Sequence, residues 1–223
     1  MVRDTSWLTW FAWLALAGAF ASAGWLITEL IRRPQRMWIM NVVWPVTALY
    51  MGPFAIWAFR TMGDARKASG PRPFWQKTFV GTTHCGSGCT LGDIIADFTI
   101  FYAGLAFFGV TATGMFLTYL TLDYVLAYLL GIAFQYLSIA PMRAVWGWPS
   151  VWAAIKADTL SLTAFEIGLF GWMALMHFVL FRPHLEPNQA AYWFMMQIGM
   201  CIGFLTSYPM NWWLVSKGIK ESM

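Results

Sequence analysis

Apolar residues in this 223-residue chain are gathered into six long blocks separated by shorter polar stretches. About 20 apolar residues are enough to cross the hydrocarbon core of a bilayer as a helix. The blocks are continuously apolar and do not alternate with polar positions, which favours helices over the strands of a barrel. The sequence therefore predicts an all-α fold, a polytopic membrane helix bundle with about six transmembrane helices, over residues 7–31, 38–59, 91–110, 115–139, 160–181 and 191–215.

The first block also resembles a secretory signal peptide, because Ala21-Ser22-Ala23 has the small residues of a cleavage site. Its apolar character continues to Ile31, which is longer than a signal peptide needs. We therefore interpret it as the first membrane helix.

A basic stretch rich in glycine and proline interrupts the pattern after the second block and contains Gly-Pro-Arg-Pro at residues 70–73. We predict a two-helix transmembrane hairpin over residues 1–66, a basic loop over residues 67–82 and a four-helix transmembrane domain over residues 83–223. Tryptophans and Pro149 interrupt residues 140–158, where a short surface helix is expected. Gly199 and Gly203 have the GxxxG spacing of closely packed helices, within the chain, between copies, or with other membrane subunits.

Composition supports a membrane protein, since 59% of the residues are hydrophobic, only 11% are charged and the mean hydropathy is +0.57. A soluble domain is about a quarter charged. The net charge of +4 is explained by anionic lipid headgroups, and no basic stripe with interleaved aromatic residues indicates nucleic acid. The expected partner is therefore the lipid bilayer.

Lysine and arginine counts predict the orientation, because cytoplasmic loops carry the excess. With six spans, ten of these residues fall on the side shared by both termini and four on the other, where Arg32, Arg33 and Arg36 form a cluster. Both termini are then expected in the cytoplasm, with the chain crossing a bacterial cytoplasmic membrane several times.

The stretch from His84 to Asp93 concentrates candidate chemistry, with Cys85 and Cys89 close to the histidine. Gly86 and Gly88 permit a tight turn, and Thr90 with Asp93 forms a pair like a capping box, so a helix is expected to begin near Leu91. The thiols would then flank the positive end of a helix at the membrane surface, where thiolate is favoured.

Three interpretations of this motif stay open. Two sulfurs, an imidazole and a carboxylate form a donor set for copper or zinc, which predicts a metal site at His84, Cys85, Cys89 and Asp93. A reactive pair of thiols would instead support redox exchange, and it would normally be reduced in the cytoplasm. The third interpretation is a structural turn, with or without a disulfide.

Further polar residues lie inside the predicted spans. Glu166, Met173 and His177 fall on one face of the fifth span, and a carboxyl group within a span is a functional candidate because its charge is costly there. Asp97 follows Asp93 by four residues on the third span, and Asp158 precedes the fifth span, where it could also be an N-cap. Met196 and Met200 have a spacing that suits either packing or passage of Cu(I).

Three motifs together resemble a family of small bacterial membrane proteins described only as a domain of unknown function. They are His84-Cys85-x-x-Gly88-Cys89 with Gly92, Ala157-Asp158-Thr159-Leu160-Ser161 followed by Glu166, and Pro209-x-Asn211-x-Trp213 with Gly218. The resemblance covers residues 83–220 and implies a four-helix membrane domain without an established activity. It singles out His84, Cys85, Cys89, Asp158, Glu166 and Asn211 without giving them roles. Many relatives carry a His-rich N-terminal tail, which implies metal handling.

The sequence has no phosphate-binding loop, no dinucleotide fingerprint, no haem-attachment motif and no HExxH, so no nucleotide cofactor is predicted, the common metallohydrolase chemistries have no support, and a non-enzymatic protein is favoured over an enzyme. The leading hypothesis is a membrane protein that binds copper or zinc at the His/Cys/Cys site and transports or delivers it. The transport-pathway candidates are Asp97, Asp158, Glu166, Met173, His177 and Asn211. The alternatives are an accessory or assembly subunit of a larger membrane complex and a membrane thiol oxidoreductase.

Overall fold

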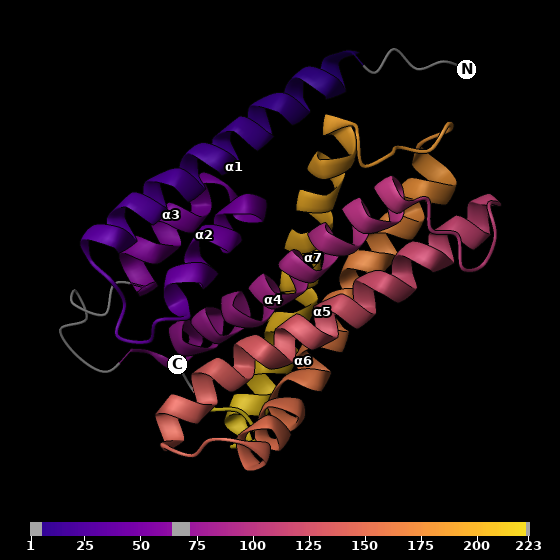
Figure 1. Ribbon diagram of the computed structural model, residues 1–223. Coiled ribbons are helices and arrows are strands. Elements are labelled where there is room, and N and C mark those ends of the chain that lie inside the picture. The colour runs from indigo at the N-terminus through magenta and orange to yellow at the C-terminus, as the bar shows by residue number, and fades with distance from the viewer. Residues whose placement is uncertain (1–5, 64–71, 222–223) are drawn as a thin grey trace.

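The computed structural model describes residues 6–63 and 72–221, and every regular element within these ranges is a helix (Figure 1). The all-α prediction is therefore confirmed for this part of the chain. The elements are α1 (Ser6–Arg32), α2 (Met40–Met51), α3 (Pro53–Ala58), the π-helical turn η1 (Phe59–Gly63), α4 (Phe74–Ala103), α5 (Ala112–Arg143), α6 (Trp148–Leu175), the π-helical turn η2 (Met176–Leu180) and α7 (Ala190–Ser216).

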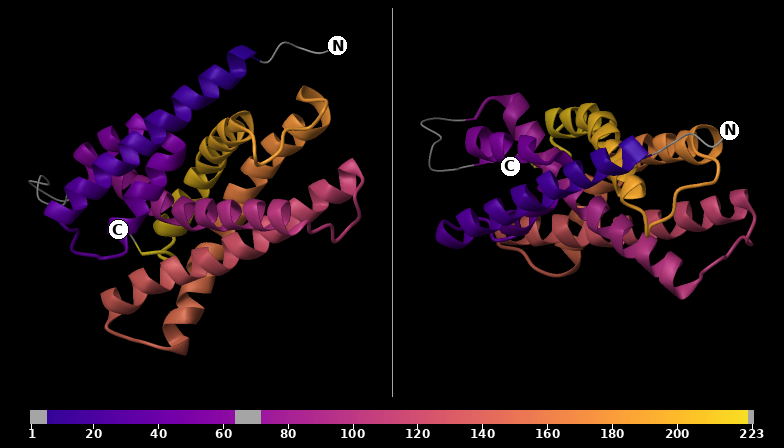
Figure 2. Two further views of the ribbon diagram at one scale, coloured as in Figure 1. Left: turned by 45° about the horizontal axis from the view of Figure 1, so that its top comes forward. Right: turned by 90° about the horizontal axis from the view of Figure 1, so that it is seen from above.

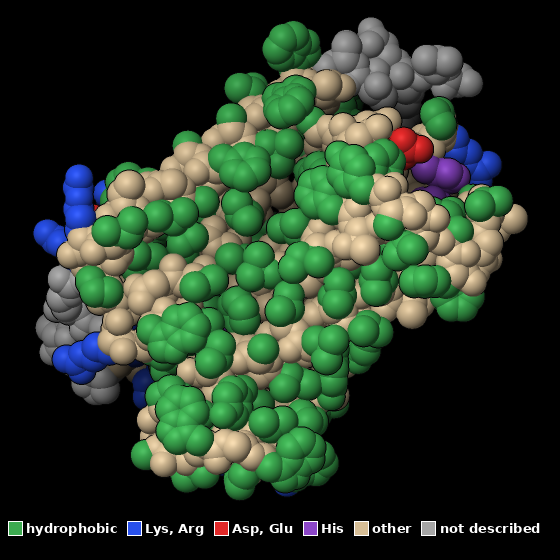
Figure 3. Space-filling model, in the orientation of Figure 1, with side chains coloured by type: hydrophobic (Ala, Val, Ile, Leu, Met, Phe, Trp, Pro, Cys, Tyr) green, Lys and Arg blue, Asp and Glu red, His purple; other side chains and the backbone are tan. Residues whose placement is uncertain are grey.

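Four helices are long and apolar enough to cross a membrane, over Trp7–Arg32, Ala112–Arg143, Trp148–Leu180 and Ala190–Ser216. Large hydrophobic side chains cover the visible face between two ends where the charged side chains gather (Figure 3). This distribution is that of a multi-pass membrane protein in contact with the bilayer. The predicted number of about six transmembrane helices is not matched, because the second and third predicted spans differ from the structure.

The second predicted span is broken at Gly52. This residue has φ +56°, and Pro53 begins α3 directly after it, so the chain reverses instead of continuing as one helix. The ring centroids of Trp44 and Phe59 lie 5.4 Å apart, whereas 15 residues of straight helix would separate these positions by ~22 Å. Residues 40–63 therefore form a helical hairpin that enters and leaves at the same end of the bundle.

The third predicted span is displaced. Helix α4 begins at Phe74, 17 positions before the predicted start, and ends at Ala103, so most of the residues expected in a basic loop from 72 to 82 are helical. Residues 67–71 of that predicted loop lie outside the described residues. The early start makes α4 30 residues long, which lets it run beside α5 in all the views (Figures 1 and 2).

Close packing of α4 against α5 depends on two glycines of α4. A Cβ atom on Gly88 would lie 2.7 Å from the Cα of Gly131, and one on Gly92 would lie 2.3 Å from the backbone nitrogen of Ala127. These pairs fix an antiparallel register in which position 92 faces position 127 and position 88 faces position 131. The glycines that suggested a turn instead bring two helix backbones together.

The GxxxG pair also acts within the chain. A Cβ on Gly199 would meet the Leu169 side chain at 2.6 Å, and one on Gly203 would meet the carbonyl oxygen of Phe165 at 2.8 Å. Both glycines are therefore buried in the packing of α7 on α6 within the chain.

No separate surface helix forms between residues 140 and 158. Helix α5 continues to Arg143, Ala144 and Gly147 have positive φ, and α6 begins at Trp148 with Pro149 in its first turn. The connection is therefore a short reversal between two long helices, because proline is compatible with the first turn of a helix.

The described chain begins and ends at opposite ends of the bundle. Helix α1 begins at the upper right of Figure 1, whereas α7 finishes at the lower left, and both views of Figure 2 agree. The prediction that both termini share one side is not supported, because the hairpin of residues 40–63 replaces one crossing. We name the end that holds the C-terminus of α7 the basic end, and the other end the cavity end.

Candidate functional site

The interior of the four long helices α4 to α7 is polar, although their outer faces are apolar. Helix α4 is buried at nearly every position from Val80 to Thr90, and its buried face continues with carboxyl groups towards the cavity end. The fully buried polar residues of α4 to α7 include His84, Asp93, Asp97, Gln135, Asp158, Ser161, Glu166, Ser207 and Asn211.

The motif around His84 lies in the middle of α4 and not in a turn before it. The expected helix start near Leu91 and the capping pair of Thr90 and Asp93 are therefore wrong, and the thiols flank no helix end. His84 is 1% exposed, and its Nε2 is 2.7 Å from Oγ of Ser138 on α5. The antiparallel register of α4 and α5 pairs position 84 with position 135, so Ser138 lies about one helical turn further along α5, within reach of the imidazole.

Cys85 belongs to a hydrogen-bonded network that joins α4, α6 and α7. The Ser161 hydroxyl lies 3.2 Å from Sγ of Cys85 and donates to it, and the Asn211 amide donates to Oγ of Ser161 at 2.6 Å. The same amide donates to Oγ of Ser207 at 2.9 Å, and Ser207 in turn donates to the Ser161 carbonyl oxygen. Cys85 and Asn211, which come from separate sequence motifs, therefore meet in one network.

A buried ion pair closes the basic end of this interior. Nζ of Lys220 lies 3.0 Å from Oδ1 of Asp158, and their side chains are only 1% and 0% exposed. Burial lowers the pKa of Lys220, but the Asp158 carboxylate raises it, and the net shift is upward from the ordinary value. Asp158 is therefore not a simple N-cap, since it lies within α6 and holds a cation from beyond α7.

Four carboxyl groups occupy the other half of the interior. Asp93 interacts electrostatically with Glu166, Asp123 and Asp97, and Glu166 lies against the Cys89 thiol. The carboxyl oxygens of Asp93 and Oδ1 of Asp123 have no hydrogen-bond partner among the described residues, whereas Glu166 faces the Cys89 thiol and Asp97 faces the Tyr192 hydroxyl. Carboxyl groups held this way in a protein interior must be protonated or must receive a cation or water from outside the chain.

Cys85, Cys89, Asp93 and Asp97 follow one another at intervals of four residues along α4. The helix rises 1.5 Å per residue, so this row extends over ~18 Å of a hydrocarbon core that is about 30 Å thick. The row continues at the basic end with the ion pair of Asp158 and Lys220 and at the other end with the cavity described below. We name this row and its partners from α5 to α7 and the segment after α7 the polar file. The partners are Asp123, Asp158, Ser161, Glu166, Ser207, Asn211 and Lys220.

The expected metal site is not formed by the predicted ligands. Within residues 6–63 and 72–221, no three His, Cys, Asp or Glu side chains converge where they could hold a metal ion. The reason is angular: Cys85, Cys89 and Asp93 share a stripe of α4, but His84 is turned by about 100° from Cys85 and bonds to α5. These donors therefore do not fit a single resident copper or zinc ion.

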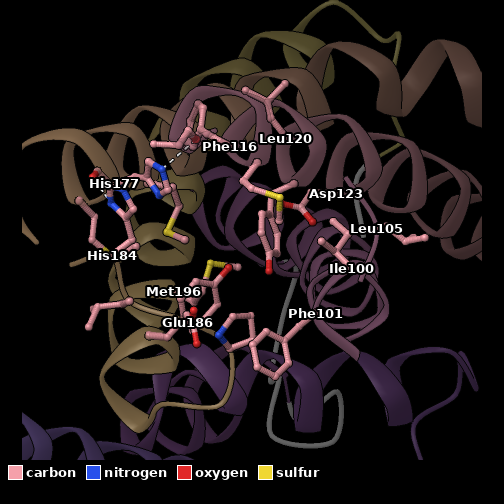
Figure 4. A pocket seen from close by; sticks show the side chains of 18 of the residues that line it. Ile100, Phe101, Leu105, Phe116, Leu120, Asp123, His177, His184, Glu186 and Met196 are labelled. Atoms are coloured by element: carbon pink, nitrogen blue, oxygen red, sulfur yellow. Dashed lines mark hydrogen bonds between the residues drawn. The ribbon is translucent and has the colours of Figure 1, made fainter. Parts of the chain in front are cut away.

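A cavity of about 480 Å³ opens at the cavity end, between the end of α4 and the segment after it, α5, α6, η2, α7 and the segment before α7. Met173, His177 and Asp123 line it, together with His184 and Met196. In Figure 4, His177, His184, Met196 and Glu186 lie on one side of this space and Asp123 lies across from them. Two predicted pathway residues, Met173 and His177, are therefore in the cavity rather than in the row on α4.

Sequence reasoning missed several members of the polar file. Asp123 has no companion within its own span, and its partners become visible only through the register of α4 and α5. Lys220 was counted only as one of the basic residues on the side of the termini, yet it reaches the interior because the chain turns at Gly218, whose φ is +68°. An isolated carboxyl group in an apolar span was the available signal for Asp123.

The fold and its interior define a class: a helical multi-pass membrane protein with titratable groups buried among its spans. The chain matches the family "Domain of unknown function (DUF4396)" over residues 74–220, and it belongs to that family. The matched range begins with α4 and includes Lys220, so it contains the whole polar file. No curated protein and no solved structure matches the chain.

Proposed function

We propose that this protein is a secondary transporter that moves a small cation, with copper and zinc the first cargoes to test, in exchange for protons along the polar file. The observation that carries the proposal is the set of buried carboxyl groups Asp93, Asp97, Asp123 and Glu166, which interact with one another and form no ion pair within the described residues. Such groups cost roughly 2.5 to 3.5 kcal/mol each as charges at the bilayer centre. If the interior served only packing, apolar side chains would fill it without this energetic cost.

The sequence of groups supports movement through the bundle. The cavity leads to Asp123, whose electrostatic partners include Asp97 and Glu166. Glu166 lies against Cys89, and Cys85 follows one turn further along α4 towards the ion pair of Asp158 and Lys220. A proton or cation moving between neighbours would therefore meet an exchangeable group at each step.

Orientation follows from the basic residues once the hairpin of residues 40–63 is taken into account. Among the described lysines and arginines, Arg182 alone belongs to the cavity end. The others belong to the basic end: Arg32, Arg33, Arg36, Arg60, Arg72, Lys77, Arg143, Lys156, Lys217 and Lys220. Because positive charge accumulates on the cytoplasmic side, we infer that the basic end is cytoplasmic and that the cavity opens to the opposite side, with α4 as an additional crossing.

The thiol oxidoreductase alternative has weaker support. Exchange requires a thiolate that reaches a partner disulfide. Cys85 and Cys89 are 1% and 0% exposed, and the Ser161 hydroxyl caps the sulfur of Cys85. One argument for the accessory-subunit alternative, the GxxxG pair, is weakened because Gly199 and Gly203 pack against α6 within the chain.

The test is flux in vesicles reconstituted with the purified full chain and loaded with a pH-sensitive dye. Copper(I), zinc(II), sodium and potassium are added outside one at a time, and internal pH and metal content are followed. We expect one cation to drive proton movement, and Glu166→Gln to reduce both fluxes by at least about tenfold, since the amide keeps the shape but cannot exchange a proton.

Thr99→Val serves as the matched control, because Thr99 is exposed and its hydroxyl donates only to the Ile95 carbonyl of its own helix. It should leave both fluxes unchanged. Vesicles that move neither protons nor any of the four cations faster than protein-free vesicles would refute the transport proposal.

A further inference from the structure

The cavity combines two kinds of soft or intermediate metal donors. Two of the three histidines of the chain line it, together with four methionines, Met115, Met173, Met176 and Met196. The two imidazole rings, His177 and His184, are stacked with centroids 3.9 Å apart and planes 7° from parallel. Thioether and imidazole groups together select Cu(I) and chemically similar monovalent cations over hard cations.

Hydrogen bonds leave one nitrogen of each imidazole available. Nε2 of His177 donates to the Ala112 carbonyl at 3.1 Å, and Nδ1 of His184 donates to the His177 carbonyl at 2.8 Å. Because a carbonyl only accepts, these nitrogens carry protons, and in the neutral rings the other nitrogens, Nδ1 of His177 and Nε2 of His184, keep their lone pairs. Neither has a hydrogen-bond partner within the described chain.

The surroundings favour a cation and keep the thioethers in place. Glu186 lies at the exposed rim of the cavity and Asp123 lies across from the imidazoles, so a carboxyl group on each side can attract a cation (Figure 4). Met176 and Met196 are each 2% exposed. The site therefore has a carboxylate at its mouth, soft donors on its wall and a carboxyl group at its inner side.

We infer that this cavity is a binding site for a soft monovalent cation of the Cu(I) class, with Met173, Met196 and the imidazoles of His177 and His184 as donors. The inference deepens the proposed transport and rests on it only for the cavity's role as the loading site. It also separates the cation site from the His84, Cys85 and Cys89 motif, which lies deeper along α4.

Silver(I) is the probe, titrated by calorimetry into the detergent-purified full chain in a chloride-free buffer. The three cysteines also bind silver, so the titration is repeated with Cys85, Cys89 and Cys201 changed to serine. We expect about one silver ion to remain bound, and Met173→Leu with Met196→Leu to weaken it by roughly tenfold or more, since metal affinity is this sensitive to its ligand environment. Leucine keeps the side-chain volume.

Met195→Leu is the control, because Met195 is buried beside Met196 but does not line the cavity. It should leave silver affinity unchanged, and X-ray absorption of the bound silver should show sulfur and nitrogen neighbours, with the nitrogen contribution reduced in His177→Gln. The same two leucine changes are also made in the chain that keeps its cysteines, where they should weaken the binding of one silver ion. This second titration tests the site even if the serine variant does not fold.

Two outcomes would overturn the inference: the serine variant binds no silver while folded, or the leucine changes leave its affinity and its sulfur neighbours as they were. Flux is measured separately. Silver bound in the cavity without any cation flux would refute transport and keep the site, whereas cation flux without cavity binding would refute the site and keep transport.

Discussion

The N-terminal part, residues 6–63, and the four-helix part, residues 74–220, bury opposite kinds of interior. The core of the N-terminal part is built from Leu26, Val43, Trp44, Phe59 and similar residues. The buried hydroxyls of Ser22 and Thr47 bond to carbonyls of their own helices, and the Tyr50 hydroxyl and Trp44 indole nitrogen buried here are uncharged as well. The four-helix part instead buries a cluster of four carboxyl side chains that form no ion pair within the described residues, and the ion pair of Asp158 and Lys220. The comparison teaches that the first region contributes packing and the second holds the chemistry.

The largest expected effect comes from removing Lys220. Lys220→Met leaves Asp158 as a buried charge without its cation, which should lower the free energy of unfolding by about 3–5 kcal/mol. The matched change in the N-terminal part, Arg33→Ala, breaks an exposed 3.6 Å pair with Glu29 and should cost less than about 1 kcal/mol. Stepwise unfolding of both variants in mixed micelles measures the difference.

The double variant Lys220→Met with Asp158→Asn sharpens this result, because a neutral pair removes the unpaired charge and should recover most of the loss. Equal losses for Lys220→Met and Arg33→Ala would contradict a buried ion pair.

The next largest effect concerns helix packing. Gly92→Ala places a methyl group 2.3 Å from the Ala127 backbone nitrogen, which cannot move away as a side chain would, so unfolding should become easier by about 1–3 kcal/mol. Gly24→Ala in α1 meets nothing within 4 Å and should be neutral or slightly stabilising. Thermal unfolding in detergent compares them, and a stable Gly92→Ala would argue against the register of α4 and α5.

A smaller effect is expected at His84. Ser138→Ala removes the partner of its Nε2 and should cost about 1 kcal/mol, since a neutral hydrogen bond contributes about that much. Thr47→Val in the N-terminal part removes a hydroxyl 3.2 Å from that of Ser87, but Ser87 keeps its bond to the Thr83 carbonyl, so the change should cost less. The free energy of unfolding of the two variants is measured in mixed micelles. A larger loss for Thr47→Val than for Ser138→Ala would contradict the buried hydrogen bond between His84 on α4 and Ser138 on α5.

The smallest effect is the change with pH, between pH 7 and 9, in the contribution of the ion pair to the free energy of unfolding. The pKa of Lys220 is raised on folding, so its stabilising contribution is complete below the ordinary lysine value of 10.5 and is lost as pH rises through the higher folded value. The stability difference between wild type and Lys220→Met should therefore stay constant from pH 7 to 9. A difference that disappears within this range would show that the pair is exposed to solvent.

The outer helices could be predicted from the sequence because lipid-facing residues produce long apolar blocks. The predicted bounds of α1 and α7, 7–31 and 191–215, differ from the structure by one residue at each end. Helix α4 was placed wrongly because Thr78, Thr82, Ser87 and Thr90 make its first half resemble a loop, although these side chains face the protein interior and not lipid. Mean hydropathy reports how polar a segment is. It does not distinguish polar side chains that face the protein interior from polar side chains that are exposed to water.

The sequence singled out individual residues of the candidate site, but it could not predict which of them contact one another. Asp97, Asp158, Glu166 and Asn211 were singled out and all are buried in the four-helix part. Their partners depend on register between helices, which places Asn211 beside Ser161 and separates His84 from the thiols. The break at Gly52 was visible as a Gly-Pro pair, but membrane helices tolerate such residues, so the reversal could not be inferred.

The ion pair of Asp158 and Lys220 imposes an order on biosynthesis. Asp158 is made 62 residues before its partner, so α6 must enter the membrane carrying a carboxyl group whose cation has not yet been translated. A single helix with such a group inserts poorly, whereas a helical pair that delivers Lys220 satisfies it. We therefore expect stable insertion of α6 to depend on the arrival of α7 and Lys220.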